Sequence, residues 1–488
     1  MNSNYTFPPE LRNLIIAALP EDTSLHGKLP ELRHTYLPAA HVKALRPESM
    51  LVVGIRGSGK SFWWAALQNS EHRRTIRKQV GFDEKTRVST GFGEKSAPDD
   101  YPGKDTISSL VQAGLDSRRI WQTIVLQQIG GKSLPKEFNR QKTWSDKVRW
   151  LQANPELVER LLFDADQELE SNRIFHLVLF DALDRTADDW KTMNNLVRGL
   201  LQTTLDFRSY SRIRLKVFVR PDQIEDPEVA VFPDSSKVLS QKTELYWPRN
   251  ELYGLLWQYL ANESDGGRSF RAGCEKFVAV KWQQSEGIWP VPVKFCADEE
   301  MQRRLFHGIT GPWMGRDRRR GFPYTWLPNH LGDARRQVSP RSFLAALRHA
   351  ALDNKPRPDY EYALHYESIK RGVQEASKIR VKEIQEDYPW VQNLFEPLSG
   401  ISVPCLFDEI RRIWESKNVL KELEQIIKTA TVRLPPVHIA KGSEGVIEDL
   451  ESLGLVERLS DERINLPDVY RVGFGIGRRG GVKPAARG

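Results

Sequence analysis

Short, largely apolar runs alternate with longer amphipathic stretches over the first half of the chain. The runs have the length and the β-branched content of buried strands, and they lie at Met50–Gly54, Ile174–Phe180 and Arg214–Val219. Periodic apolar positions between them predict helices from Ser61 and over 105–129, 144–153 and 156–170. Strands separated by helices of this length need crossover connections, so the pattern predicts an α/β fold with a parallel sheet.

The second half of the chain has helical periodicity and no strong strand signal until its end. The clearest helices are predicted at 251–262 and 342–353, and a charged stretch over 356–385 is typical of a connecting helix or linker. From about residue 396, three helices are predicted near 405–417, 418–430 and Ser443–Leu453. The segments LVERL and VYRVGF then predict a two-stranded hairpin. Three helices followed by a hairpin form the winged-helix pattern.

Composition and charge narrow the class of protein without naming its chemistry. The 72 Lys and Arg residues exceed the 64 Asp and Glu residues, and this excess of +8 permits anionic partners but does not require them. Three isolated cysteines, without a CxxC pair, argue against a zinc site or a disulfide framework and favour a reducing cytoplasm. We find no apolar run of about 18 residues and no secretory leader, so we expect no membrane partner.

One motif carries specific chemistry. Residues 54–61 read GIRGSGKS, a complete GxxxxGKS between the first predicted strand and the helix that follows. Its glycines let backbone N–H groups surround phosphate oxygens, while the lysine reaches the β and γ phosphates and the serine hydroxyl holds Mg²⁺. We therefore expect ATP and Mg²⁺ as ligands. The candidate nucleotide-binding residues in this segment are Gly54, Arg56, Gly57, Ser58, Gly59, Lys60, Ser61 and Phe62.

A second acidic element is needed because Mg²⁺ and the attacking water both require carboxylate partners. Asp181 follows the second predicted strand, and we assign it to Mg²⁺ together with Ser61. Asp184 is the candidate for orienting or deprotonating the water, because Ala182 stands where many such ATPases carry a glutamate. The alternative for both acids is that they cap the helix expected near Thr186. With Asp184 in this role, turnover is expected to be slow and switch-like.

Arg220 follows the third predicted strand and precedes Pro221 and Asp222. A cation at this strand end could sense the γ phosphate and stabilise charge in the transition state. The alternative is a surface arginine paired with Asp222. Lys60, Asp181, Asp184 and Arg220 are thus the candidate catalytic residues.

The elements GIRGSGKS, LVLFDALDR and VFVRPD together resemble the additional-strand ATPases that group AAA+ proteins with the STAND ATPases, including the NACHT and KAP-like branches. The segment SPRSF at 339–343 resembles the second sensor helix of origin-recognition-type AAA+ proteins. This resemblance implies that Arg341 contacts the nucleotide and that His41 lies near the adenine. The alternatives are a Ser339 helix cap with an ordinary ion pair for Arg341, and a plain surface position for His41.

The resemblance gives names to the parts of the chain. We expect an N-terminal arm at 1–49 and a P-loop ATPase core at 50–247. A helical lid at 248–355, a connecting helix or linker at 356–395 and a winged-helix module at 396–488 would follow. Such a chain would be an ATP-driven switch in which the lid closes and the protein assembles with itself or recruits an effector protein. The resemblance suggests bacterial antiviral defence as the setting.

A DNA-binding loader or scaffold ATPase is the alternative function. The arginine-rich loop 316–320, with Trp313, Tyr324 and Trp326 around it, could hold phosphates, stack on a base, or supply an arginine finger to a neighbouring subunit. The third helix of the terminal module carries four carboxylates, which disfavours DNA reading through that face. The remaining basic candidates in this module are Lys441, Arg471, Arg478 and Arg479. GFGIGRRGG at 473–481 is expected to be a flexible exit and not a dinucleotide loop.

Overall fold

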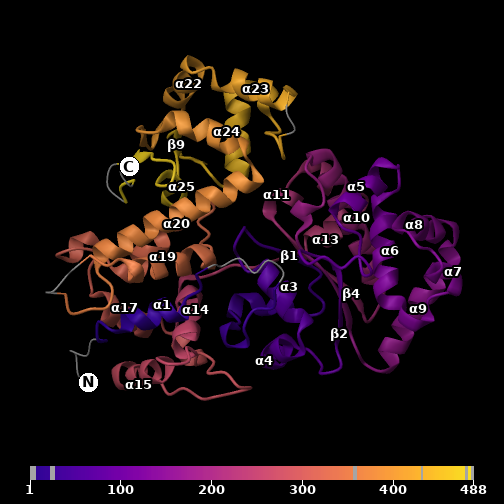
Figure 1. Ribbon diagram of the computed structural model, residues 1–488, viewed down its shortest axis with the longest axis horizontal. Helices are drawn as coiled ribbons and strands as arrows, with labels where there is room; N and C mark the ends of the chain where they lie inside the picture. Colours follow the sequence, from indigo (N-terminus) through magenta and orange to yellow (C-terminus); the bar gives the residue numbers. More distant parts are fainter. Residues whose placement is uncertain (1–6, 22–27, 356–359, 430–431, 479–481, 485–488) are drawn as a thin grey trace. The chain divides into compact units, whose positions relative to one another are not determined.

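The computed structural model describes residues 7–21, 28–355, 360–429, 432–478 and 482–484. The chain divides into two compact units. We call Ser24–Tyr246 the sheet unit and Met1–Thr23 with Trp247–Gly488 the helical unit, and we describe each by itself (Figure 1). The segment expected to form one N-terminal arm is therefore shared between the two units.

The sheet unit is built on five parallel strands, in the order β2-β3-β4-β1-β5. The strands are β1 Leu51–Val53, β2 Arg87–Phe92, β3 His176–Phe180, β4 Ile213–Val219 and β5 Thr243–Glu244. The α/β fold class and the three predicted strands are confirmed, while β2 and β5 were not predicted. Strand β4 lies between β1 and β3, so an additional strand separates the strand before the GxxxxGKS motif from the strand before Asp181.

Helices cover both faces of this sheet (Figure 1). Leu177 and Leu179 of β3 belong to the buried cluster that also contains Trp63 of α3, whereas Phe180 points to the opposite face, where its ring lies 5.7 Å from that of Trp121 in α6. Two-sided burial explains why β3 reads as a continuous apolar run. The helices of this unit are α2 Val42–Leu45, α3 Lys60–Gln68, α4 Ser70–Val80, α5 Lys104–Gln112, α6 Ser117–Gly130, α7 Lys136–Asn139, α8 Trp144–Ala153, α9 Pro155–Ser171, α10 Trp190–Asp206, α11 Pro221–Ile224, α12 Pro227–Ala230 and α13 Ser235–Leu239.

Lys216 is the exception to the apolar interior of β4. It is fully buried, and its Nζ donates to the carbonyl oxygens of Ala44 and Arg46 at 2.9 Å each. Burial lowers the pKa of Lys216 to about 7. The lysine thereby fastens the segment before β1 to the centre of the sheet, which positions the start of the strand that leads into the nucleotide motif.

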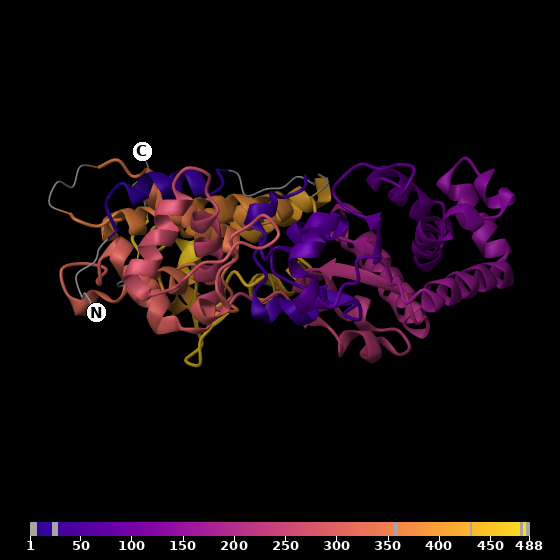
Figure 2. The same cartoon turned by 90° about the horizontal axis from the view of Figure 1, so that it is seen from below.

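The helical unit has an aromatic core. The ring of Tyr253 in α14 stacks on Tyr324 of α18 at 4.2 Å and meets Phe306 of α17 and Phe343 of α19 at 4.8 and 5.1 Å. Most of the charged stretch that was predicted to be a connecting helix or linker forms the long helix α20, orange in Figures 1 and 2. The helices up to this point are α1 Leu11–Ala18, α14 Arg249–Ala261, α15 Gly267–Val278, α16 Val293–Ala297, α17 Glu299–Thr310, α18 Pro323–Asn329, α19 Pro340–Leu352 and α20 Tyr366–Asp387.

The last part of the helical unit combines helices with short strands. Strands β7, β9 and β8 form an antiparallel sheet in that order, and β10 pairs in parallel with β6. The elements are α21 Trp390–Phe395, β6 Ser402–Val403, β7 Cys405–Leu406, α22 Phe407–Ser416, α23 Val419–Thr429, α24 Gly442–Ser452, β8 Glu457–Arg458, β9 Arg463–Asn465, α25 Asp468–Arg471 and β10 Gly477–Arg478.

Two expectations for this region are wrong. The hairpin is completed by β9, while most of VYRVGF lies in or after helix α25, which starts behind Pro467 and is held by the Arg471–Asp468 pair at 2.7 Å. The segment GFGIGRRGG is not wholly a flexible exit, because Gly477–Arg478 forms β10. Residues 479–481, including Arg479, lie outside the described residues.

Within the described ranges, no helix is long and apolar enough to cross a membrane. The same residues contain no group of three or more His, Cys, Asp and Glu side chains that could hold a metal ion among themselves.

Candidate nucleotide-binding site

The loop between β1 and α3 has the backbone that phosphate binding requires. Gly57 and Gly59 have φ angles of +78° and +102°, in a backbone region that residues with a Cβ rarely adopt. A Cβ on Gly54 would lie only 2.3 Å from the Ser58 hydroxyl oxygen, so the turn closes on itself at this point. Helix α3 begins at Lys60, and its first N–H groups therefore face the loop.

Lys60 lies over the mouth of this loop. Its Nζ donates to the carbonyl oxygens of Gly54 at 2.7 Å and Ile55 at 3.0 Å. Burial lowers the pKa of Lys60 to about 8, against the opposing influence of the Asp181 carboxylate. The ammonium is thus partly desolvated and bound by weak neutral acceptors, which a phosphate could replace with a charged one.

Asp181 is the buried carboxylate of the site. Burial raises the pKa of Asp181, although a hydrogen bond from Ser61 and the charge of Lys60 oppose this. Its Oδ2 atom is buried and has no hydrogen-bond partner among the described residues. A hydroxyl and a carboxylate in contact, with one buried oxygen unsatisfied, fit a hard cation such as Mg²⁺. Ser61 and Asp181 would hold it, and it would neutralise phosphate charge.

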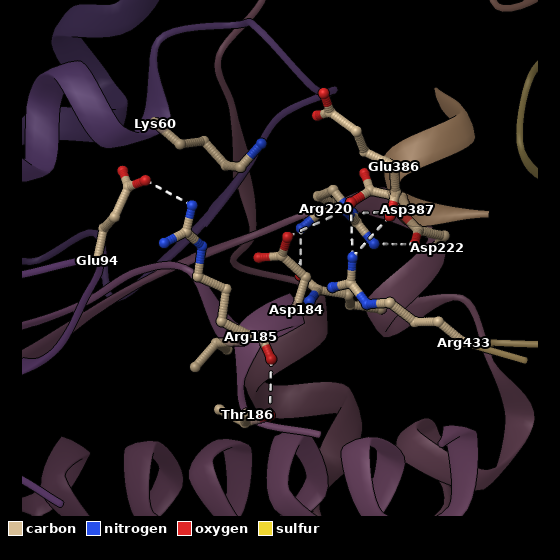
Figure 3. Close-up of polar contacts among 12 residues, drawn as sticks. Lys60, Glu94, Asp184, Arg185, Thr186, Arg220, Asp222, Glu386, Asp387 and Arg433 are labelled. Carbon is tan, nitrogen blue, oxygen red and sulfur yellow. Dashed lines mark hydrogen bonds and ion pairs between the residues drawn. The ribbon is translucent and has the colours of Figure 1, made fainter. Parts of the chain in front are cut away.

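Arg220 is buried at the end of β4 and bridges two carboxylates. Its Nη1 lies 3.5 Å from Asp184 Oδ2, and its Nε and Nη2 lie 3.1 and 3.0 Å from the two oxygens of Asp222 (Figure 3). The alternative of a surface arginine paired with Asp222 is thus right about the pairing and wrong about the surface position. The structure therefore brings Lys60, Asp181, Asp184 and Arg220 to the carboxyl ends of three neighbouring strands.

The helix-capping alternative for the two acids is also wrong. Helix α10 begins at Trp190, and its N-cap is Asp189, whose side chain accepts a hydrogen bond from the backbone of Thr192 at 2.8 Å. Asp181 and Asp184 lie before this cap. Capping of helix α10 therefore does not explain why Asp181 and Asp184 lie at the strand end.

His41 is fully buried, so the surface alternative is wrong. The indole N–H of Trp63 donates to Nδ1 at 3.2 Å, which makes Nε2 the protonated nitrogen that donates to the carbonyl oxygen of Tyr246 at 3.1 Å. Burial lowers the pKa of His41 to about 3 and keeps the ring neutral. His41 thus joins α3 to the chain after β5, and a contact with adenine stays a prediction from the resemblance.

Arg341 belongs to the helical unit, in the first turn of α19. Its Nη1 lies 2.6 Å from Glu383 Oε1 in α20, and the Ser339 side chain makes no cap hydrogen bond to α19. The ion pair of the alternative reading is therefore present, whereas its serine cap is not. Contact between Arg341 and nucleotide stays a prediction.

The hydrophobic pattern does not reveal β2 or the acidic residue that follows this strand. The segment RVSTGF is too polar to stand out as a strand, because it borders the sheet at one edge. Glu94 comes two residues after β2, and its Oε1 lies 2.5 Å from Nη2 of Arg185 (Figure 3). The signal that could have revealed it is the glycine pair of GFGE, which marks a close backbone approach at a strand end.

The basic segments outside the motif differ in how far their side chains could contact nucleic acid. The loop Arg316–Arg320 is exposed, but Tyr324 is buried in the aromatic core, Trp313 packs on Phe322 at 5.0 Å and Trp326 stacks on His330 at 3.9 Å. Base stacking on these three aromatic residues is thus not supported. Arg471 is fully buried and cannot contact DNA.

The acidic face of α24 is largely neutralised inside its own module. Arg458 lies 3.6 Å from Glu451 and also pairs with Glu444, while Lys441 Nζ lies 2.8 Å from Glu448. Asp449 accepts from His438 at 2.7 Å. Repulsion of a phosphate surface by four unpaired carboxylates, as the sequence suggested, is therefore reduced.

Comparison with known proteins gives structural likeness only. No protein-family model matches the chain, and a search of the curated proteins gives no match. Among solved structures, the chain is similar to Cdc6p from Pyrobaculum aerophilum, at 12% identity and a TM-score of 0.31, over 96% of this chain and 95% of that one. It is similar to the Aeropyrum pernix ORC1 protein in complex with DNA, at 14% identity and a TM-score of 0.35, over 97% and 96% of the two chains. It is also similar to the Aeropyrum pernix ORC2 protein in ADPNP and ADP complexes, at 12% identity and a TM-score of 0.32, over 94% of this chain and 98% of that one. With identities and TM-scores this low, the activity has to be argued from the site itself.

Proposed function

We propose that this chain binds ATP with Mg²⁺ at the loop 54–61 and hydrolyses it. One observation carries the proposal: Lys60 and the Ser61–Asp181 pair meet at the mouth of a glycine loop that opens a helix. The loop N–H groups and Lys60 would bind the phosphates, and Ser61 with Asp181 would hold the cation. Arg220 would counter charge that develops on the γ phosphate, with Asp184 and Asp222 orienting its guanidinium.

We propose further that nucleotide state controls assembly with a second copy or recruitment of an effector protein. The paired arginine at a strand end supports a switch, because a guanidinium held by two carboxylates can exchange partners when a phosphate arrives. The setting of antiviral defence rests on the family resemblance alone, and no residue of the site bears on it.

Nucleotide binding tests the first proposal directly. A fluorescent ATP analogue should bind the purified chain in the presence of Mg²⁺, and Lys60→Ala should weaken binding by roughly 100-fold or more, since it removes a charge-assisted contact worth about 3 kcal/mol at a desolvated site. Lys78→Ala, an exposed lysine in α4, is the matched control and should bind as the parent does. Equal affinity of the Lys60→Ala variant and the parent would refute the proposed site.

A DNA-binding loader or scaffold is the second candidate function. The observation that favours it is the exposed loop Arg316–Arg320, together with a terminal module whose β7-α22-α23-α24-β8-β9 order and antiparallel sheet agree with a winged helix. Labelled duplex DNA should then shift in a salt-dependent manner, and glutamine at positions 318, 319 and 320 should reduce the slope of log affinity against log salt. Absence of binding at low salt would exclude this function.

A further inference from the structure

The position that usually supplies a water-activating carboxylate holds no acid in this chain. Ala182 directly follows Asp181 and has a φ angle of +56°, so the backbone turns sharply away from the line of β3 at this point. The chain then enters a short 3-10 turn over Leu183–Arg185. Asp184 is carried with this turn to the β4 side, where it contacts Arg220. A carboxylate beside Ala182 would therefore have to come from a neighbouring strand.

The pairing of β2 with β3 brings Glu94 to that place. The register matches Phe92 with Phe180 after an irregularity between Thr90 and Phe92. The ladder continues by one further bond, in which the N–H of Asp181 donates to the carbonyl oxygen of Phe92 at 3.1 Å. Glu94 follows Phe92 by two positions, as Ala182 follows Phe180. Since paired strands lie about 4.8 Å apart, Glu94 follows the end of β2 beside the end of β3, from which Asp181 and Ala182 continue.

The end of β2 is also fastened to the helix that follows the nucleotide loop. The indole N–H of Trp64 in α3 donates to the same carbonyl oxygen of Phe92 at 3.1 Å. A Cβ on Gly93 would lie 2.1 Å from the Trp64 ring, so only glycine permits this approach. Glu94 thus follows a strand end that is held by α3, the helix that carries Lys60, and by the backbone of Asp181. A general base needs this kind of rigid support.

Glu94 and Arg185 form an ion pair beside the site. Their side chains meet at 2.5 Å, and Figure 3 shows the Glu94 carboxylate turned to the Arg185 guanidinium, with the Lys60 side chain drawn above them. The Glu94 side chain is 15% exposed and that of Arg185 is 52% exposed. The Glu94 carboxylate therefore lies inward and the Arg185 guanidinium outward. This arrangement would let the arginine move while the carboxylate stays in place.

We propose, on the basis of the ATP hydrolysis proposed above, that Glu94 and not Asp184 activates the attacking water, with Arg185 as its positioning residue. One water hydrogen passes as a proton to the Glu94 carboxylate while the water oxygen forms a bond to the γ phosphorus. The bond between that phosphorus and the β–γ bridging oxygen breaks, and its electron pair leaves with ADP. The proton is afterwards released from Glu94 to solvent or to phosphate.

Single-turnover phosphate release and analogue binding test this assignment in the full chain. Glu94→Gln should bind the fluorescent ATP analogue within about threefold of the parent and lose about 100-fold or more in turnover, the usual contribution of a general base. Glu94→Asp should recover part of the rate. Asp184→Asn should lose less than Glu94→Gln. Asp188→Asn, which removes the partner of Lys104 in another ion pair of this region, is the matched control and should turn over at the parent rate.

The effect of Arg185 on turnover separates positioning from structure. Arg185→Gln should lower the single-turnover rate while analogue binding stays within about threefold of the parent, and thermal stability should change little because the pair is partly exposed. Arg185→Lys should recover part of the rate, since it keeps a cation beside the carboxylate. An unchanged rate in Arg185→Gln would contradict the role of Arg185, and a loss of stability with an unchanged rate would assign the pair to structure alone.

The outcomes distinguish this proposal from the one on which it rests. If the parent binds the analogue but releases no phosphate from ATP, hydrolysis itself is wrong, and the role of Glu94 falls with it. If the parent turns over and Glu94→Gln does so at the same rate, only the assignment of Glu94 is overturned. Equal losses in Glu94→Gln and Asp184→Asn would likewise overturn the choice between them.

Discussion

Replacing Asp181 by asparagine should stabilise the nucleotide-free protein while removing its response to Mg²⁺. The side chain is buried, its Oδ2 has no hydrogen-bond partner among the described residues, and burial raises its pKa. A raised pKa means that the fold disfavours the charged form, since desolvation outweighs the Ser61 hydrogen bond and the charge of Lys60. Asparagine keeps the shape and an oxygen for Ser61, but it carries no charge.

The sign of the effect follows from proton linkage. An aspartate whose pKa is higher in the folded state than in the unfolded chain costs stability above that folded pKa, and the cost disappears as pH falls below the unfolded value near 4. Neutral pH lies above the unfolded value, in the range where this cost is felt. A buried unsatisfied polar group is worth about 1–3 kcal/mol, so we expect Asp181→Asn to gain about 1–2 kcal/mol, or roughly 2–8 °C in Tm for a unit of this size.

Urea and thermal unfolding at pH 7 would measure both effects. Samples in EDTA give the stability of the nucleotide-free protein, and samples without EDTA, with and without Mg²⁺ and ATP, give the response to the ligands. The parent should gain about 2.7 kcal/mol when the ligand is present at 100 times its Kd, and Asp181→Asn should lose the part of this gain that depends on Mg²⁺. Lower stability of the variant in EDTA would refute the argument that Asp181 is held in an unfavourable charged state. An unchanged Mg²⁺ response would refute its place at the cation.

Three further predictions concern other positions. Because His41 has a pKa of about 3 in the fold, acidification from pH 7 to 5.5 should cost about 1.3 kcal/mol at this residue. The stability of His41→Gln should therefore depend less steeply on pH, and equal slopes would contradict a neutral buried ring. Gly54→Ala adds a Cβ 2.3 Å from a loop hydroxyl and should lower nucleotide affinity at least tenfold, whereas Gly103→Ala, with open space around it, should not. Arg471→Met removes the fully buried partner of Asp468, which keeps only longer contacts with Arg478 at 3.3 Å and His330 at 3.6 Å. The variant should lose about 3 kcal/mol in denaturant unfolding, against less than about 1 kcal/mol for Arg463→Met at an exposed pair. Similar costs would refute the difference.

The sequence by itself determined the central strands and the nucleotide motif. Strands β1, β3 and β4 are buried on both faces, so their apolar runs stand out without knowledge of their partners. The glycines and Lys60 follow from local backbone requirements, since positive φ angles and the start of a helix are encoded within a few residues. The place of Asp181 and Arg220 after their strands then followed from the rule that parallel strands end at one edge of the sheet.

Only the tertiary structure decided which groups face one another across strands. Edge strand β2 carries polar residues and a weak pattern, so Glu94 became visible only through its register with β3. Burial likewise reversed the reading of His41, because a single polar residue in the sequence does not show that its partner Tyr246 lies far along the chain. It also reversed the reading of Arg471, whose partners are close in sequence but whose burial depends on the packing around them. Contacts over long sequence distances depend on packing, and packing is a property of the whole fold.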